Sequence, residues 1–259
     1  MQGQTHNLSR KGDFMKSLIF FAAGHSQSLA YAAEVLQKEG FCFAPEPDRS
    51  VTHLLLDIPH KDWASVPDVL SALSNDVTVI GGNLRHPCLA EYKTVDLLSD
   101  PLYLAENANI TAHCAIKLAL QNLPVILENC PVLVIGWGRI GKCLAKLLRN
   151  LGARVTVAAR KESDRAMLSA LGYTAAETGF LADSLSGYRL IFNTVPAGVL
   201  PESVLSRCSE DCCKIELASL PGIAGSDVID GKGLPGKLAP ETSGSLIAQT
   251  ILRLKGALL

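Results

Sequence analysis

Residues 131–160 read PVLVIGWGRIGKCLAKLLRNLGARVTVAAR, and this stretch predicts the fold class. It opens with an apolar run, 132–135, that has the length and composition of a buried strand. A GxGxxG pattern follows at Gly136, Gly138 and Gly141, and leucines at helical spacing come next. Glycine is common in turns, so the pattern alone is weak evidence. Its position between a strand and a helix predicts the first turn of a dinucleotide-binding βαβ unit.

The glycines of this turn have separate expected tasks. Gly136 permits the tight turn, Gly138 lets the backbone approach a pyrophosphate, and Gly141 lets the helix pack closely on the strand. The helix N-terminus adds unpaired N–H groups and a partial positive charge. The alternative is a tight strand-to-helix turn that binds nothing. The predicted cofactor-binding residues here are Gly136, Trp137, Gly138, Arg139, Ile140 and Gly141.

The choice of cofactor is expected at the end of the next strand, about 20 residues further on. A site for NAD places an Asp or Glu there, to accept hydrogen bonds from the ribose hydroxyls. Strand 154–158 instead continues as Ala159-Arg160-Lys161, without a carboxylate. Arg160 and Lys161 suit the 2′-phosphate of NADP, so the sequence favours NADP(H) over NAD(H). The alternative is two solvated surface cations.

Two later strands, 190–194 and 214–217, end in loops that we expect at the nicotinamide half of the site. Ligands of open parallel sheets bind outside the carboxyl ends of the strands, and both loops fall there. The first loop could equally be an ordinary strand-terminating turn. The loop residues assigned to the cofactor are Thr194, Val195, Pro196, Ala218 and Ser219.

Strand and helix patterns alternate along the whole chain, which is typical of parallel sheets with crossover helices. The predicted fold class is α/β: a doubly wound parallel sheet of the Rossmann type, with a second, smaller N-terminal α/β domain. We expect three or four strands in that smaller domain. Its predicted strands are 18–22, 53–58 and 77–81, and its predicted helices are 28–38 and 66–73.

The domain boundaries follow from these patterns. Residues 15–106 are expected to form the smaller domain, and 107–239 the cofactor domain, which begins with a connecting helix at 108–120. A final helical stripe within 240–259 is expected to pack back and complete the smaller domain. Residues 1–14 are polar and are expected to be a disordered leader.

Composition excludes several classes of protein. The chain of 259 residues is 48% hydrophobic, so it can bury a sizeable core, and its net charge of −1 includes no basic block for a nucleic acid. Its apolar runs are too short to span a membrane. The eight cysteines form no CxxC pair, and no secretory signal precedes them. We therefore expect reduced thiols in a cytoplasmic protein without a metal site.

From about residue 107 to residue 254 the chain resembles the A subunits of the dipicolinate synthases of spore-forming bacteria. Beyond 132–161, the matching stretches are the helix 109–120, IFNTVPAGVL at 191–200 and ELASLPG at 216–222. The most specific match is GLPGKLAPETSGSLIAQTIL at 233–252, because a plain Rossmann domain does not need it. The fold of this family resembles that of the D-2-hydroxyacid dehydrogenases.

The resemblance implies an oxidoreductase of dipicolinic acid biosynthesis. The implied reaction is NADP-dependent oxidation of dihydrodipicolinate, or of its hydroxylated tetrahydro precursor, to dipicolinate during sporulation. The implied partners are a small dicarboxylate substrate and a flavoprotein-like B subunit, in the mother-cell cytoplasm. A homo-oligomer is compatible with this architecture, whereas a nucleic acid or a membrane is not expected as a partner.

The resemblance also directs attention to substrate and catalytic residues. Backbone N–H groups within 220–223 and 233–237 could receive a carboxylate, as could the side chains of Arg85, His86 or Lys237. His113 is the candidate base, although a lone histidine on an apolar helix is more often structural. Threonines beside helix starts are commonly caps. The implied substrate residues are Pro221, Gly222, Pro235, Gly236 and Thr242, and the implied catalytic residues are His113 and Thr111.

The chain departs from the family in ways that keep other functions open. Segment 221–233 is shorter than expected and is predicted to lack a helix and a strand, and the N-terminal half matches poorly. One alternative is a related NADP-dependent dehydrogenase of another small carboxylate. Another is a non-catalytic, NADP-binding subunit that regulates a partner or serves as its scaffold.

Overall fold

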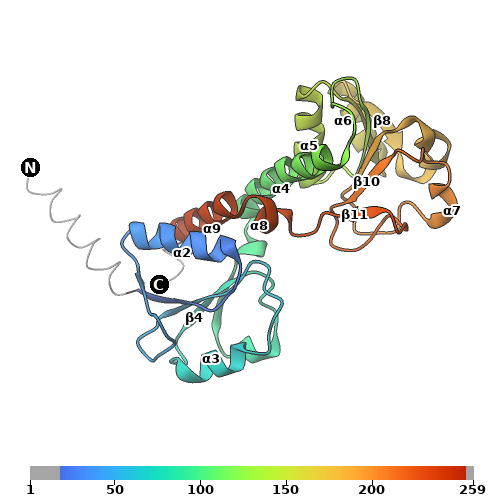
Figure 1. The fold of residues 1–259 in the computed structure, drawn as a ribbon. Helices are drawn as coiled ribbons and strands as arrows, with labels where there is room; N and C mark the ends of the chain where they lie inside the picture. The colour runs from blue at the N-terminus through green and yellow to red at the C-terminus, as the bar shows by residue number, and fades with distance from the viewer. Residues whose placement is uncertain (1–17, 255–259) are drawn as a thin grey trace, which may run out of the picture. The chain divides into compact units, whose positions relative to one another are not determined.

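The computed structural model describes residues 18–254. These residues divide into two compact units: 18–107 with 239–254 form the first, and Ala108–Leu238 form the second. Figure 1 shows a parallel sheet with flanking helices in each unit. The predicted leader, 1–14, and the end of the predicted last helix, 255–259, lie outside the described residues.

The sheet of the first unit has five parallel strands in the order β2-β1-β3-β4-β5. The sequence predicted three or four, which was wrong. The two unpredicted strands lie at the edges of the sheet, are short and are largely exposed, so neither carries a buried apolar run. The strands are β1 (Ile19–Ala22), β2 (Cys42–Phe43), β3 (His53–Leu55), β4 (Thr78–Gly81) and β5 (Lys93–Asp96).

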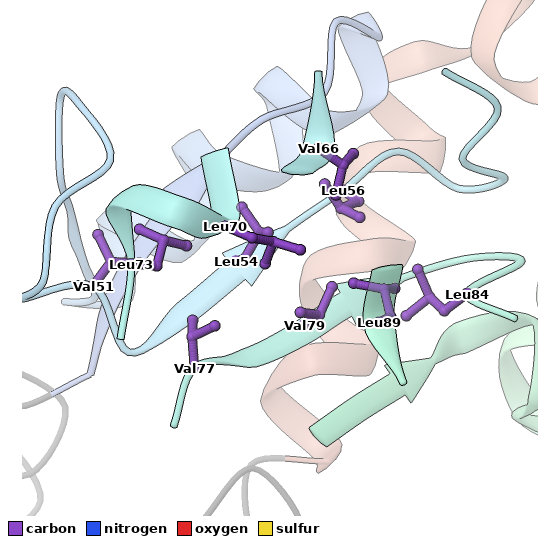
Figure 2. Close-up of a cluster of buried hydrophobic side chains, with 10 residues drawn as sticks. All are labelled: Val51, Leu54, Leu56, Val66, Leu70, Leu73, Val77, Val79, Leu84 and Leu89. Atoms are coloured by element: carbon purple, nitrogen blue, oxygen red, sulfur yellow. The ribbon is translucent and has the colours of Figure 1, made fainter. Parts of the chain in front are cut away.

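One face of this sheet carries an apolar core beneath α3 (Val66–Ala72). Figure 2 shows Leu70 of α3 beside Leu54 of β3, with Val79 of β4 in the same cluster. Burial of each such side chain stabilises the fold by about 1.5–3 kcal/mol. Two short 3₁₀ helices, η1 (Pro87–Leu89) and η2 (Leu97–Ser99), complete this part of the chain.

Helix α2 (Gln27–Lys38) packs against β1 and β2, and α9 (Pro240–Leu254) packs along α2. The two helices cross closely at Gly244. A Cβ atom there would lie 2.5 Å from the carbonyl oxygen of Ser28 and 2.5 Å from the Cβ of Tyr31. The last helix of the chain therefore belongs to the core of the first unit.

Helix α4 (Pro101–Asn122) begins in the first unit and continues into the second, so it is longer than the predicted helix 108–120. Asp100 precedes it, and its carboxylate accepts hydrogen bonds from the backbone N–H of Tyr103 at 2.7 Å and from Arg253 of α9 at 2.8 Å. These contacts hold the start of α4 against the end of α9.

The second unit contains six parallel strands in the order β11-β10-β9-β6-β7-β8. Read from β6, this is the doubly wound order of dinucleotide-binding sheets, so the predicted fold class is confirmed. The strands are β6 (Pro131–Ile135), β7 (Arg154–Ala159), β8 (Thr174–Glu177), β9 (Leu190–Asn193), β10 (Cys213–Glu216) and β11 (Val228–Asp230), and the helical segments are α5 (Arg139–Asn150), α6 (Glu162–Ala170), η3 (Thr178–Gly187), α7 (Glu202–Leu205) and α8 (Leu234–Leu238).

Strand β11 corrects one expectation. Segment 221–233 was predicted to lack a strand, yet β11 lies within it and pairs with β10. This strand has only three residues, none fully buried, so its sequence has no recognisable pattern. The segment contains no helix before β11, and its chain is joined to the sheet region by the bridge between Leu200 and Ile223. Among residues 18–254, no helix is long and apolar enough to cross a membrane.

Candidate nucleotide-binding site

The turn after β6 requires glycine at its first position. Gly136 has a φ of +109°, and a Cβ atom there would collide with Thr194 and lie 2.8 Å from Val195 Cγ2. Its N–H donates to the carbonyl oxygen of Ala158 at 2.9 Å, which holds the turn against β7. The turn is therefore packed between the ends of β7 and β9.

The other two glycines of the pattern differ in what surrounds them. A Cβ atom on Gly141 would collide with the carbonyl oxygen of Gly136, so α5 can approach the turn only if residue 141 is glycine. A Cβ atom on Gly138 would meet no atom within 4 Å, and Gly138 has an ordinary φ of −80°. The fold thus needs Gly136 and Gly141, whereas Gly138 leaves open space at the start of α5.

The start of α5 is suited to an anion. Gly138 is its N-cap and has no side chain to accept from the first N–H groups of the helix. Arg139 is exposed beside it and Ile140 is half-buried. Trp137 is also half-buried, with its ring 5.8 Å from the ring of Tyr173 and 5.7 Å from the Lys142 ammonium. A phosphate here would meet backbone donors and a nearby cation.

The end of β7 carries two exposed cations. Arg160 and Lys161 follow the buried Ala159, and neither side chain makes an ion pair within residues 18–254. No carboxylate occupies the last residues of β7. The predicted 2′-phosphate residues therefore lie where the doubly wound fold places the ribose of the adenine half.

Arg165 of α6 supports this loop and was missed from the sequence. Its Nη1 donates to the carbonyl oxygens of Ala159 at 3.1 Å and Arg160 at 2.7 Å. Its Nη2 lies 3.3 Å from Glu177 at the end of β8. An arginine in an exposed helix resembles any surface cation, so only the folded structure reveals that this one holds the backbone of the loop.

The end of β9 lies against the glycine turn. Both the N–H and the hydroxyl of Thr194 donate to the carbonyl oxygen of Ile135 at 2.9 Å. Val195 contacts the position that a Cβ of Gly136 would take, and Pro196 is exposed. The structure thus brings Thr194 and Val195 together with the glycine turn.

A buried carboxylate at the end of β10, Glu216, was also missed. It is 4% exposed and accepts hydrogen bonds from the Asn193 side chain and from three backbone N–H groups of the following loop. A lone glutamate at a strand end resembles an ordinary surface residue. A strand-end asparagine opposite it, Asn193, is the only hint in the sequence, and it requires the sheet order to be known.

This carboxylate changes the interpretation of the loop after β10. The N–H groups of Gly222 and Ile223, expected to receive a substrate carboxylate, donate to Glu216 at 2.7 Å and 3.1 Å. The N–H of Ala218 also donates to Glu216, at 3.0 Å. Ser219 and Pro221 are exposed. A substrate carboxylate would have to displace Glu216 to use these amides.

The remaining candidates of the second unit lie on helices and not in the strand-end loops. Pro235 and Gly236 are part of α8 rather than of the expected loop, and the N–H of Lys237 donates to the carbonyl oxygen of Gly233, the residue before the helix. His113 is exposed on α4, whereas Thr111 is buried in the middle of the same helix, so Thr111 is no cap at a helix start.

The candidates of the first unit are described separately. Thr242 is exposed in the first turn of α9. Arg85 is exposed after β4, while the ring of His86 stacks on Trp63 at 4.3 Å between centroids, with Nδ1 3.0 Å from Cys88 Sγ. Arg85 is thus the accessible member of the pair.

The cysteines are all free thiols. Burial raises the pKa of Cys212 to about 12 and also raises the pKa of its neighbours Cys208 and Cys213. Beside them Lys214 is buried, with its ammonium 2.7 Å from Asp227. Within residues 18–254, no group of three or more His, Cys, Asp or Glu side chains is arranged to hold a metal ion.

Comparison with known proteins agrees with this architecture. No family model matches the chain. The A subunit of dipicolinate synthase from Bacillus subtilis (strain 168) is 30% identical over 173 residues, which are 64% of this chain and 58% of that protein. Over these residues the chain is similar in sequence to a dipicolinate synthase A subunit. The resemblance predicted from the sequence is therefore confirmed, over little more than half the length of the curated relative.

Solved structures of two dipicolinate synthase A subunits have the same fold as this chain. The A subunit of Bacillus halodurans has a TM-score of 0.82 at 21% identity, covering 93% of this chain and 98% of that one. The solved Bacillus subtilis protein has a TM-score of 0.77 at 21% identity, covering 94% and 97%. A transhydrogenase from Sinorhizobium meliloti has a TM-score of 0.73 at 14% identity, covering 93% and 94%. The similarity of fold thus extends over nearly the whole chain.

Proposed function

We propose that this chain is the NADP-binding subunit of a dipicolinate synthase, an oxidoreductase that converts dihydrodipicolinate, or its hydroxylated tetrahydro precursor, to dipicolinate. The relatedness to the A subunits of dipicolinate synthases supports the substrate. The residues of the second unit support the cofactor. The related proteins are subunits, which supports the presence of a partner subunit, and we place the complex in the cytoplasm of a sporulating mother cell.

One observation carries the cofactor assignment. Gly138 lies at the start of α5 with no atom within 4 Å of a Cβ position, so the fold itself does not demand glycine there. A pyrophosphate that approaches the backbone does demand it. The uncapped N–H groups of α5 would bind the phosphates, and Arg160 with Lys161 would bind a 2′-phosphate.

The chemistry asks little of the protein beyond binding and orientation. NADP⁺, when bound, would supply a hydride acceptor: loss of a hydride and a proton converts dihydrodipicolinate to the aromatic dipicolinate, and the hydroxylated tetrahydro precursor must first lose water. Thr194 and Val195, held against the glycine turn, would orient the nicotinamide half. These residues restrict where the hydride acceptor can lie.

Turnover tests the proposal. Purified protein is mixed with NADP⁺ and freshly generated hydroxy-tetrahydrodipicolinate, with and without a second subunit, while NADPH absorbance and dipicolinate are followed together. Formation of both in equal amounts is the expected result. NADPH binding without dipicolinate in either mixture would contradict the proposed reaction.

A second function, a non-catalytic NADP-binding subunit, is favoured by one observation. The loops after β9 and β10, 194–199 and 217–223, contain no acidic, basic or histidine side chain. These loops therefore offer no group to take a proton, and any base must come from elsewhere. Cofactor binding without turnover, even when the partner subunit is present, would select this function.

A further inference from the structure

The side chain of Glu216 joins the two loops at the nicotinamide half of the sheet. Its carboxylate oxygens lie 2.9 Å and 3.0 Å from Asn193 Nδ2, which belongs to the end of β9. They also accept from Ala218, Gly222 and Ile223, all in the loop after β10. These donors converge on one buried carboxylate, whose negative charge strengthens each of the hydrogen bonds.

Asn193 extends this contact into its own loop. Its Nδ2 donates to the carbonyl oxygen of Val195 at 2.9 Å, and its Oδ1 accepts from the N–H of Val195 at 3.0 Å. The loops also touch directly, because a Cβ atom on Gly222 would lie 2.5 Å from the carbonyl oxygen of Ala197. Glu216 and Asn193 therefore hold the backbones of the two loops in fixed positions relative to each other.

The place of this pair in the sheet gives it a functional meaning. Strands β9, β10 and β11 form the second half of a doubly wound sheet, and the two halves each bind one mononucleotide of a dinucleotide. The glycine turn and Arg160 belong to the first half. Glu216 thus lies under the half that the proposed function assigns to nicotinamide.

We infer that Glu216 is a positioning residue for the nicotinamide half of the cofactor, acting through Asn193 and the two loops. It also occupies the amides of Gly222 and Ile223, so the loop presents no free anion-binding nest there. This inference rests on the proposed function. It goes beyond it by assigning separate protein groups to the two halves of the dinucleotide.

A purely structural carboxylate would behave differently, and the first unit provides one for comparison. Asp96, at the end of β5, accepts from the backbone N–H groups of Asn83, Leu84 and Leu98. It joins two strand-end loops as Glu216 does, but outside the cofactor unit. Asp96→Asn is therefore a matched control for Glu216→Gln.

The test compares NADPH with 2′-phospho-ADP-ribose, which lacks the nicotinamide. In Glu216→Gln the amide –NH₂ replaces an acceptor, so one or more loop donors lose their partner. We expect NADPH affinity to fall about tenfold, the effect of one misplaced hydrogen bond. The affinity of Glu216→Gln for 2′-phospho-ADP-ribose should stay at the wild-type value. Asp96→Asn should bind both nucleotides with wild-type affinity. The fluorescence of bound NADPH should also move toward that of free NADPH.

The outcomes separate this inference from the proposed function. Wild-type protein that binds neither nucleotide overturns the proposed function and the inference with it. If the wild-type protein binds both nucleotides, the inference alone is overturned when Glu216→Gln loses affinity for the two nucleotides equally, or for neither of them. If Glu216→Gln does not fold, Asn193→Ala replaces it, because this variant keeps the carboxylate and its backbone donors. Asn193→Ala must then lose affinity for NADPH and keep its affinity for 2′-phospho-ADP-ribose. Equal loss of affinity for the two nucleotides overturns the inference.

Discussion

The three glycines of the turn after β6 differ in what they do for the protein. Gly141 lies against the backbone of Gly136, whereas Gly138 faces open space. The close contact at Gly141 is required for folding, whereas the open space at Gly138 is available to a ligand. Substitution by alanine separates the two contributions at the scale of one methyl group.

We predict that Gly138→Ala keeps the wild-type melting temperature and loses NADPH affinity, because its methyl group enters the space that a pyrophosphate needs. Gly141→Ala should destabilise the protein by about 1–3 kcal/mol or more, because its methyl group would collide with backbone. Thermal denaturation and nucleotide titration of both variants check this. A Gly138→Ala protein with unchanged NADPH affinity would show that this space binds no phosphate.

Arg160 is predicted to decide the preference between the two nicotinamide cofactors. Arg160→Asp should weaken NADPH binding by about tenfold or more, the loss of a charge-assisted contact, and should affect NADH much less. Lys146→Asp on α5 makes the same charge change at another exposed site and is the control. Equal loss of NADPH and NADH in Arg160→Asp would contradict the NADP assignment.

At the scale of the element, Asp100 connects the start of α4 to the end of α9. The hydrogen bond from Arg253, followed by that from the backbone of Tyr103, holds the pKa of Asp100 below its ordinary value of 3.8. A lowered pKa means that the folded protein favours the charged carboxylate. Its contribution to stability is therefore complete above about pH 4 and is lost as pH falls through the folded-state pKa.

Asp100→Asn should consequently lower the free energy of unfolding by about 1 kcal/mol at neutral pH, since Arg253 is partly exposed and the ion pair is screened. The difference from wild type should shrink as the solution is acidified below pH 4 and vanish once the wild-type carboxyl is protonated. Denaturation at a series of pH values measures it. A difference that stays constant down to pH 2 would rule out this electrostatic origin.

The sequence predicted the elements that are buried and periodic. Strands β6, β7, β9 and β10 were expected within one or two residues of their observed bounds, as was α5 with its glycine turn. Strands β2, β5, β8 and β11 were not predicted, because they lie at sheet edges and carry no buried apolar run. Edge strands form by pairing with a neighbour, and pairing is invisible in a local pattern.

The candidate site was predictable to the same degree. The glycine turn depends on local chemistry, and its position was read from the sequence. Glu216 accepts a hydrogen bond from Asn193, which is distant in sequence, and Arg165 donates to backbone carbonyl oxygens. Neither contact can be predicted before the fold is known. The sequence therefore suggested that the Gly222 amide was available to a substrate, because it could not show that this amide donates to Glu216.

At the scale of the whole molecule, the chain combines two parallel sheets of different strand order in two units. The second unit carries the glycine turn, the exposed cations and the loops joined by Glu216. The first unit carries α9, which returns from the end of the chain to pack on α2. The proposed binding of NADP depends on residues of the second unit alone.

NADP binding can be tested by titrating the wild-type protein with NADPH and with NADH under identical conditions, followed by calorimetry or nicotinamide fluorescence. We expect both to bind, and NADPH to bind about tenfold more tightly or better, because Arg160 and Lys161 would contact the 2′-phosphate. NADH binding as tight as NADPH, or no binding of either, would contradict it.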